Sequence, residues 1–314
     1  MLKVAITGAN SFIGSHLIEK LSSLNVTINA LYRNAPRMNN HYNNVHFYSG
    51  NLLESATLKD FIKGCDVVIN LSYLWEHDCT QNLEAIRNLA DTCVSHKIKR
   101  FIHCSTTSVY GTVVINSVDE DTPCNPQTEY AKTKFALENY LLEHYISSFE
   151  IMILRPTQVF GPRGKNLLKL ADDLIKGSSL KNYLKSSLMA KKPMNLVCVD
   201  NVVGAIEYLV YLKKSNKFIY IVSDDDAKAN NFHQVESYLM SQLKIPDYFF
   251  PYCSLPLFLY KNLSRIMGKG SINPKTIYYG KNLTDAGYIK PVKFEDGLAK
   301  FMEWYKLRIG NKVR

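Results

Sequence analysis

Tyr130 and Lys134 are the two residues of this 314-residue chain whose types and spacing best fit proton transfer. Tyr130 alone among the twenty tyrosines has a lysine four positions later. On a helix this spacing places both side chains on one face, one turn apart. A phenol has a pKa of about 10, and a nearby ammonium lowers that pKa. The pair could therefore exchange a proton with a carbinol or carbonyl group.

The elements that would position this pair alternate along the first half of the chain. The residue pattern predicts strands at 4–6, 27–32, 45–48, 66–71 and 100–104, and helices at 12–24, 56–63 and 82–96. A helix from 199 and a strand at 218–222 continue the pattern. Strands alternating with helices indicate a mainly parallel sheet with helices on both faces. Right-handed connections make this a doubly wound (Rossmann) α/β fold.

A glycine turn follows the first predicted strand, in Thr7-Gly8-Ala9-Asn10-Ser11-Phe12-Ile13-Gly14. Gly8 allows a tight turn, and Gly14 allows the helix to pack closely on the strand. The start of the helix then faces a pyrophosphate, although Ser11 stands where many such turns carry glycine. The predicted dinucleotide contacts of this turn are Gly8, Asn10, Ser11, Phe12, Ile13 and Gly14.

The end of the second predicted strand bears on the choice of cofactor. A carboxylate there would bind the adenosine ribose of NAD, but the residues are Tyr32 and Arg33. An arginine instead suits the 2′-phosphate of NADP, and Arg37 could assist. We therefore expect NADP, with NAD as the alternative.

Composition limits the remaining possibilities. Seven scattered cysteines without a C-x-x-C pair indicate reduced thiols, and the N-terminus has no signal layout, so we expect a cytoplasmic protein. The apolar stretch 248–263 contains two prolines and a lysine, which argues against a membrane span and leaves a buried lid or an interface patch. The net charge of +10 suits an anionic ligand. The basic C-terminus is typical of a solvated tail, so no nucleic-acid partner is expected.

Taken together, the motifs resemble the extended short-chain dehydrogenase/reductases, also called the NAD-dependent epimerase/dehydratase family. The matching segments occur in the family's order, at 7–14, 50–52, 70–73, 82, 105–111, 130–134, 154–162, 199–202, 287–291 and 304–305. The resemblance implies a dinucleotide-binding domain of residues 1–155 plus 199–223, with 156–198 and 224–314 as a smaller substrate-binding lobe. It also implies a homodimer through helices near 82–96 and 128–145.

The same resemblance implies roles for individual residues. Thr106, four residues before Tyr110, would bind the substrate oxygen and share a proton with Tyr130. Lys134 would hold the nicotinamide ribose and lower the pKa of Tyr130, while the cofactor carries the hydride. Further implied cofactor contacts are Asn51, Leu52, Leu71, Ser72, Tyr73 and Pro156, and the expected substrate contacts are Thr107, Gln158 and Lys165. No metal site is expected.

Some positions depart from the family pattern. Thr107 and Ser108 stand where dehydratases carry Asp-Glu, so water elimination lacks an acid and a base. Gln158 and Met194 replace an asparagine and an arginine that hold the diphosphate in many nucleotide-sugar members. Lys165 could replace that clamp, but a lysine is a point charge rather than a fork.

These features predict an NADP(H)-dependent reductase of a 4-keto nucleotide-diphosphate sugar. The close alternative is a nucleotide-sugar 4-epimerase that retains NAD. A third possibility is a reductase of an apolar, steroid- or lipid-like substrate, which the missing clamp and the apolar stretch suggest. A non-catalytic cofactor-binding protein is the fourth, and the intact tyrosine–lysine pair argues against it.

Overall fold

A seven-stranded parallel sheet forms the centre of the computed structural model, which describes residues 1–33, 42–189, 192–250, 273 and 275–310. The strand order is β10-β7-β5-β4-β1-β2-β3. The strands are β1 (Leu2–Thr7), β2 (Val26–Tyr32), β3 (Val45–Ser49), β4 (Val67–Asn70), β5 (Arg100–Cys104), β7 (Glu150–Pro156) and β10 (Ile219–Val222). Arg37 and residues 251–263 of the apolar stretch lie outside the described residues.

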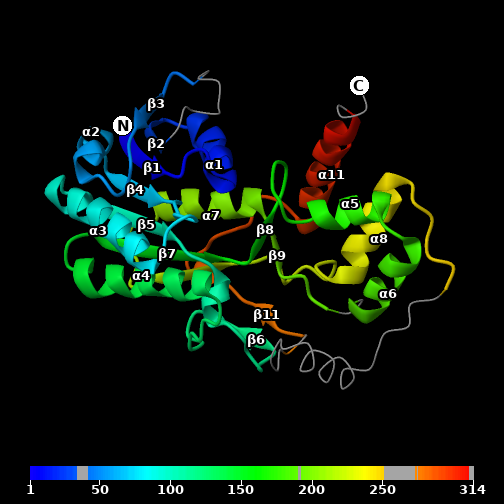
Figure 1. Cartoon of the computed structure of the whole chain (residues 1–314). Helices are drawn as coiled ribbons and strands as arrows, with labels where there is room; N and C mark the ends of the chain where they lie inside the picture. Colours follow the sequence, from blue (N-terminus) through cyan, green and yellow to red (C-terminus); the bar gives the residue numbers. More distant parts are fainter. Residues whose placement is uncertain (34–41, 190–191, 251–272, 274, 311–314) are drawn as a thin grey trace.

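Helices cover both faces of this sheet (Figure 1). One face packs on α1 (Phe12–Ser22) and α7 (Val199–Tyr211), and the other on α3 (Cys79–Ser95) and α4 (Glu129–Tyr145). Successive side chains of β1 alternate between the two cores, with Val4 and Ile6 in one and Ala5 in the other. The doubly wound α/β fold predicted from the sequence is therefore confirmed.

Two predicted helices differ from the observed elements, one in its type and one in its first residue. The segment expected as a helix over 56–63 is a 3₁₀ turn, η1 (Ser55–Leu58), followed by one turn of α-helix, α2 (Lys59–Ile62). The helix expected from residue 82 begins at Cys79, because the Asp78 side chain accepts a hydrogen bond from the Gln81 amide and caps it. Neither change moves the sheet edge that carries the predicted site.

A second hydrophobic core lies beside the sheet, among α5 (Leu168–Lys176), α8 (Phe232–Leu243) and α11 (Phe294–Gly310). Helix α6 (Ser179–Met189) packs against α8, on the side away from the sheet (Figure 1). Two short parallel pairs complete the fold: β8 (Gln158–Phe160) with β9 (Leu196–Cys198), and β6 (Ser117–Val118) with β11 (Ile277–Tyr278). A short helix, α10 (Lys281–Asp285), packs near β10.

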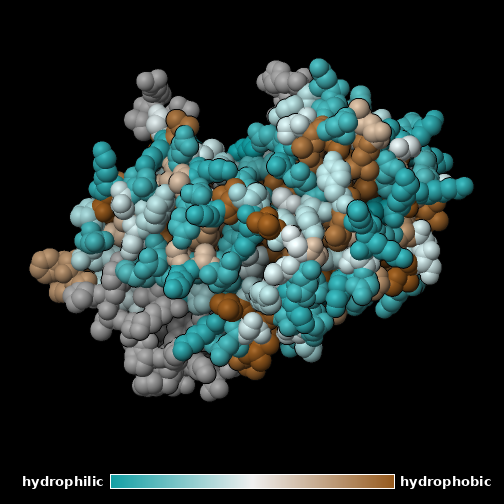
Figure 2. Space-filling model, turned by 180° about the vertical axis from the view of Figure 1, so that it is seen from behind, coloured by the Kyte–Doolittle hydropathy of each residue, from teal (hydrophilic) through white to brown (hydrophobic). Residues whose placement is uncertain are grey.

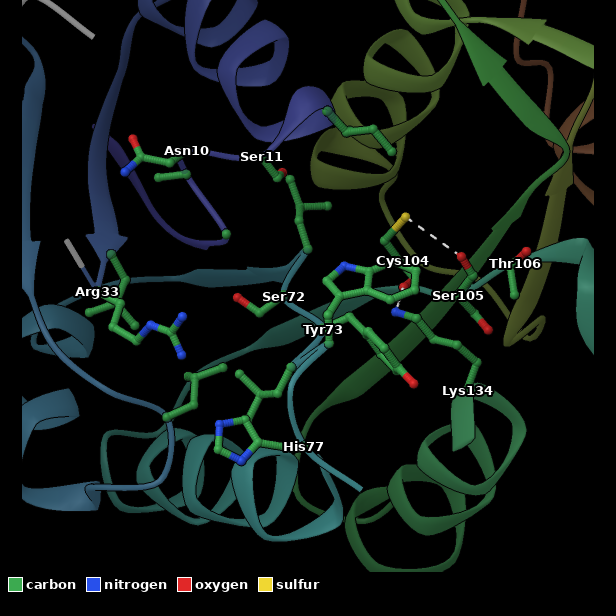
Figure 3. Close-up of a pocket in the computed structure, with 18 of the residues that line it drawn as sticks. Asn10, Ser11, Arg33, Ser72, Tyr73, His77, Cys104, Ser105, Thr106 and Lys134 are labelled. Atoms are coloured by element: carbon green, nitrogen blue, oxygen red, sulfur yellow. Dashed lines mark hydrogen bonds between the residues drawn. The ribbon is translucent and has the colours of Figure 1, made fainter. Parts of the chain in front are cut away.

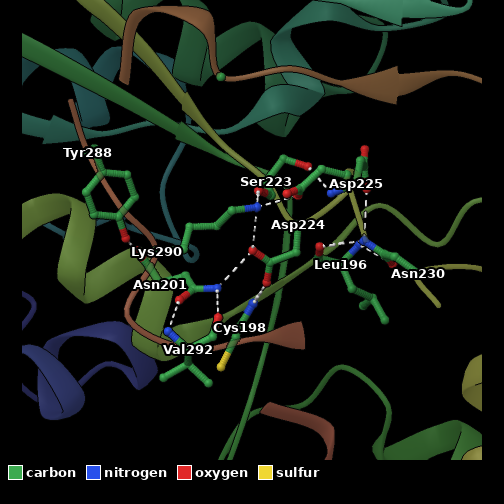
Figure 4. A network of polar contacts seen from close by, with 12 residues as sticks. Leu196, Cys198, Asn201, Ser223, Asp224, Asp225, Asn230, Tyr288, Lys290 and Val292 are labelled. Atoms are coloured by element: carbon green, nitrogen blue, oxygen red, sulfur yellow. Dashed lines mark hydrogen bonds and ion pairs between the residues drawn. The ribbon is translucent and has the colours of Figure 1, made fainter. Parts of the chain in front are cut away.

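A buried polar network joins three segments that are far apart in the sequence (Figure 4). The Asp224 carboxylate accepts hydrogen bonds from the Cys198 amide at 2.8 Å and the Asn201 side chain at 2.9 Å. The Lys290 ammonium lies 3.3 Å from the same carboxylate and donates to the Ser223 carbonyl. The Asp224 carboxylate therefore has several hydrogen-bonding and charged partners. These contacts connect β9, β10 and the segment before α11.

The face seen in Figure 2 is mostly hydrophilic, with hydrophobic residues in small scattered groups. In the described part of the chain, no helix is both long and apolar enough to cross a membrane. The six cysteines within that part are all free thiols.

Candidate active site

A cleft of about 600 Å³ opens at the carboxyl edge of the parallel sheet, where such folds bind ligands (Figure 3). Arg33 lies at one end, and Lys134 and Thr106 lie at the other. The cleft is lined by the predicted residues Gly8, Asn10, Ser11, Ile13, Arg33, Asn51, Leu52, Leu71, Ser72, Tyr73, Thr106, Tyr130, Lys134 and Pro156. Residues predicted from separate motifs therefore meet in one cavity.

The glycine turn forms the floor at the start of α1. Gly8 has a φ of +68°, and a Cβ there would lie 2.9 Å from the Leu71 carbonyl carbon. A Cβ on Gly14 would lie 2.2 Å from the Gly8 oxygen, so the turn and the helix pack too closely for any side chain there. Ser11 is the N-cap, and its hydroxyl accepts a hydrogen bond from the Gly14 amide at 3.0 Å. Gly14 thus shapes the turn without lining the cleft, and the predicted contact Phe12 does not line it either.

Lys134 is buried beneath the cleft. Its ammonium donates a 2.8 Å hydrogen bond to the Cys104 carbonyl and lies 5.3 Å from the centre of the Tyr73 ring (Figure 3). Burial lowers the pKa of this ammonium, while Cys104 and Glu138 act in the opposite direction. The side chain is therefore fixed at the end of β5, on the helix that also carries Tyr130.

Tyr130 is packed between two other aromatic rings. Trp75 stacks on its ring at 5.1 Å between centroids, and Tyr73 meets it edge-on at 4.9 Å. Burial raises the pKa of the Tyr130 phenol above its ordinary value, and a hydrogen bond with Thr106 opposes this rise. Burial is the largest cause of the rise, and the expectation that Lys134 lowers this pKa stays a prediction.

Thr106 occupies the end of β5 on the same side of the cleft. Its hydroxyl accepts a hydrogen bond from the Ser108 amide at 3.2 Å and so caps the 3₁₀ turn η2 (Thr107–Tyr110). The neighbouring Ser105 and Thr157 hydroxyls are buried against the cleft and have no hydrogen-bond partner among the described residues. Unpartnered polar groups beside a glycine cradle fit a polar ligand such as a dinucleotide.

At the far end, Arg33 has a charged neighbour that the sequence did not reveal. Its guanidinium lies 3.8 Å from the Glu76 carboxylate, and both side chains are more than half exposed. Asn51 contributes to the same wall, with its amide donating to the Glu54 carboxylate at 3.0 Å. An exposed pair of this kind is weak, so Arg33 remains available to a ligand.

The three predicted substrate contacts are not placed together. Thr107 and Gln158 line a second cavity of about 310 Å³, and the Thr107 hydroxyl donates to the Pro156 carbonyl at 3.3 Å. Lys165 is exposed and lines neither cavity. Lining residues that the sequence analysis did not single out as contacts include Trp75, Glu76, His77, Cys104, Ser105, Thr157 and Val159. The sequence could have pointed to Trp75, because this residue lies two positions beyond the matched segment 70–73.

No group of three or more His, Cys, Asp or Glu side chains in the described segments is arranged to hold a metal ion.

Comparison with known proteins identifies the family. The profile of the NAD dependent epimerase/dehydratase family matches residues 4–192. This chain belongs to that family, as its motifs suggested. The match covers more than half of the chain and includes the glycine turn, Thr106, Tyr130 and Lys134.

Individual relatives share about a quarter to a third of their residues with the chain. An uncharacterized UDP-glucose epimerase of Bacillus subtilis is 33% identical over 52% of this chain and 58% of its own length. A dTDP-D-glucose 4,6-dehydratase of Dictyostelium discoideum is 27% identical, and only 55% of its length is covered. An N-acetyl-alpha-D-glucosaminyl-diphospho-ditrans,octacis-undecaprenol 4-epimerase of Escherichia coli O157:H7 is 24% identical over 96% of this chain and 94% of its own.

The solved structure of a UDP-glucose 4-epimerase from Thermotoga maritima superposes with a TM-score of 0.76 at 18% identity, covering 98% of this chain and all of that one. This likeness confirms the fold.

Proposed function

We propose that this protein is an NAD-dependent 4-epimerase of a sugar carried on a diphosphate. The observation that carries the proposal is the convergence of Thr106, Tyr130 and a buried Lys134 in the cleft that begins at the glycine turn. Bound NAD would supply the hydride acceptor and donor. The chain's own groups would handle the proton and hold the ligands.

Each of the three side chains has a distinct task. Thr106 and Tyr130 would both bind the oxygen on the reacting sugar carbon, and Tyr130 would take its proton and return it. Lys134 is held at the end of β5 by its hydrogen bond to the Cys104 carbonyl, and its ammonium would hold the nicotinamide ribose. A cation there stabilises the phenolate, which burial alone disfavours.

Water elimination is not part of the proposal, because the groups beside Thr106 are not placed to perform it. The Thr107 hydroxyl is buried and donates to the Pro156 carbonyl, and Thr107 lines the second cavity. The Ser108 hydroxyl accepts a hydrogen bond from the Thr106 hydroxyl, and the Ser108 amide donates one to it. Neither is an acid or a base of the kind that dehydratases place there.

The second candidate is the NADP(H)-dependent 4-keto sugar reductase expected from the sequence. Arg33, at the adenosine end of the cleft, is the observation that favours it. Glu76 weakens that argument, because its carboxylate would repel a 2′-phosphate bound at the Arg33 guanidinium. Two of the relatives described above are named as epimerases, which supports an epimerase that retains NAD.

The smaller lobe, residues 156–198 and 224–314, would recognise the rest of the substrate. Gln158 and Lys165 remain its predicted contacts. The E. coli relative is named for a sugar diphosphate on a polyprenol rather than a nucleotide, which suits a chain without the usual nucleotide clamp. Dimerisation through α3 and α4 stays a prediction, as does a cytoplasmic location, which the free thiols support.

Cofactor retention tests the proposal. One sample of the purified protein is denatured, and the NAD that it releases is measured. A second, native sample is incubated with UDP-glucose, UDP-N-acetylglucosamine or the polyprenyl-diphosphate sugar. An epimerase will invert the configuration at C4 of the sugar without net consumption of the cofactor, and NMR can follow this inversion. Stoichiometric oxidation of NADPH with a 4-keto sugar would establish the reductase instead. Failure to bind either cofactor would exclude both.

A further inference from the structure

Trp75 is the large apolar side chain that the proposed mechanism does not use. It is 75% exposed although it lines the cleft. Its ring lies nearly parallel to that of Tyr130, with an interplanar angle of 8°, and it meets Tyr73 edge-on at 4.7 Å. A parallel pair with centroids 5.1 Å apart is offset, so the indole covers only part of the phenol.

The backbone that carries Trp75 is fixed on both sides by one buried side chain. Asn82 accepts a hydrogen bond from the Leu74 amide at 3.0 Å and donates to the Leu74 and His77 carbonyls at 3.1 and 3.3 Å. Asn82 is itself buried at the start of α3. The loop therefore presents the indole at a defined place. Because one ring face stacks on Tyr130 and Trp75 is 75% exposed, its opposite face is open.

An open indole face beside a proton-transferring phenol is suited to a particular ligand surface. A pyranose ring carries a face of C–H groups, and covering an exposed indole with such a face removes apolar area from water. A nucleoside diphosphate such as UDP lacks the attached pyranose and has no such face to place there. Tryptophan is also among the residues whose truncation most often weakens binding.

We propose that Trp75 is a specificity-determining residue whose open face binds the C–H face of the substrate's pyranose ring. The contact holds the pyranose in the cleft beside Tyr130 and contributes to binding rather than to the proton transfer. This inference rests on the proposed function, since it takes a sugar to be the group that enters this end of the cleft.

Fluorescence can test the contact without turnover. The chain has two tryptophans. Trp304 belongs to α11, where it contacts Phe301 and Arg308, and it does not line the cleft. In the Trp304→Phe variant, Trp75 is the only indole. With NAD present, UDP-glucose should change its emission, whereas UDP should leave it unchanged. An equal response to both, or none to UDP-glucose when the nucleotide sugar binds by calorimetry, would overturn the proposal.

Kinetics provide the second readout. Trp75→Ala should raise KM by about tenfold or more and leave kcat within about threefold, while Trp75→Phe restores most of the KM. Trp304→Phe is the matched control and should change neither. A Trp75→Ala enzyme with an unchanged KM would refute the contact while the epimerase stands. A sugar-dependent change in emission without any C4 conversion would refute the epimerase while the contact stands.

Discussion

The ion pair between Arg155 and Glu138 joins the catalytic helix to the sheet. The side chains are 2% and 1% exposed, and two parallel hydrogen bonds of 3.1 and 2.5 Å connect them. Arg155 lies on β7, and its guanidinium also sits over the Tyr110 ring at 4.9 Å. Glu138 lies on α4, one helical turn after Lys134. We therefore expect this pair to hold α4 in register with the strand ends.

Replacing Glu138 with glutamine keeps the size of the side chain and removes its charge. The Arg155 guanidinium would then remain buried without a counter-charge. Breaking a buried pair in this way costs about 3–5 kcal/mol, because the remaining charge is desolvated and unpaired. The expected loss is a large part of the roughly 5–15 kcal/mol by which domains are stable.

Urea unfolding at pH 7, followed by circular dichroism, measures this loss. The double replacement Glu138→Leu with Arg155→Met removes both charges, and it should be much less destabilising than Glu138→Gln. The exposed pair of Glu129 with Lys132 on the same helix is the matched control, and Glu129→Gln should cost about 0.5 kcal/mol or less. A loss below about 1 kcal/mol for Glu138→Gln, or a double variant as unstable as the single one, would refute the reasoning.

Three further predictions address catalysis, cofactor choice and pH. Tyr130→Phe should lower turnover by ~10²–10⁴ because proton transfer is lost and leave NAD affinity nearly unchanged by calorimetry; retention of more than about a tenth of the activity would exclude Tyr130 as the acid/base. Arg33→Ala should abolish any preference for NADP, worth roughly 1.5–3 kcal/mol for a charged hydrogen bond, in parallel titrations with both cofactors; a preference that survives would place the 2′-phosphate elsewhere. Burial raises the pKa of Asp225 from 3.8 to about 6, so the folded chain holds a proton that the unfolded chain releases, and this group makes stability fall as pH rises from about 4 to 6. Asp225→Asn should weaken this dependence of stability on pH, measured by urea unfolding between pH 4.5 and 7. An unchanged dependence would contradict the raised pKa of Asp225.

Local pattern was enough to predict the parallel sheet and the edge at which the cleft lies. Strand and helix periods depend on neighbouring residues, so β5 was predicted at its observed bounds and α1 at its observed start. Parallel strands all end at one edge, which is why residues from separate motifs could be expected to meet there. The four-residue spacing of Tyr130 and Lys134 likewise fixed their common helix face.

Interactions between segments distant in sequence were beyond such patterns. The sequence contains Trp75, but only tertiary packing places its ring on Tyr130, 55 positions later, and burial of the phenol raises its pKa. The Arg155–Glu138 pair and the Glu76 neighbour of Arg33 also arise between elements. Periodicity predicts which face of an element is buried. The groups that meet across that face, and the water that they exclude, depend on how the elements pack in three dimensions.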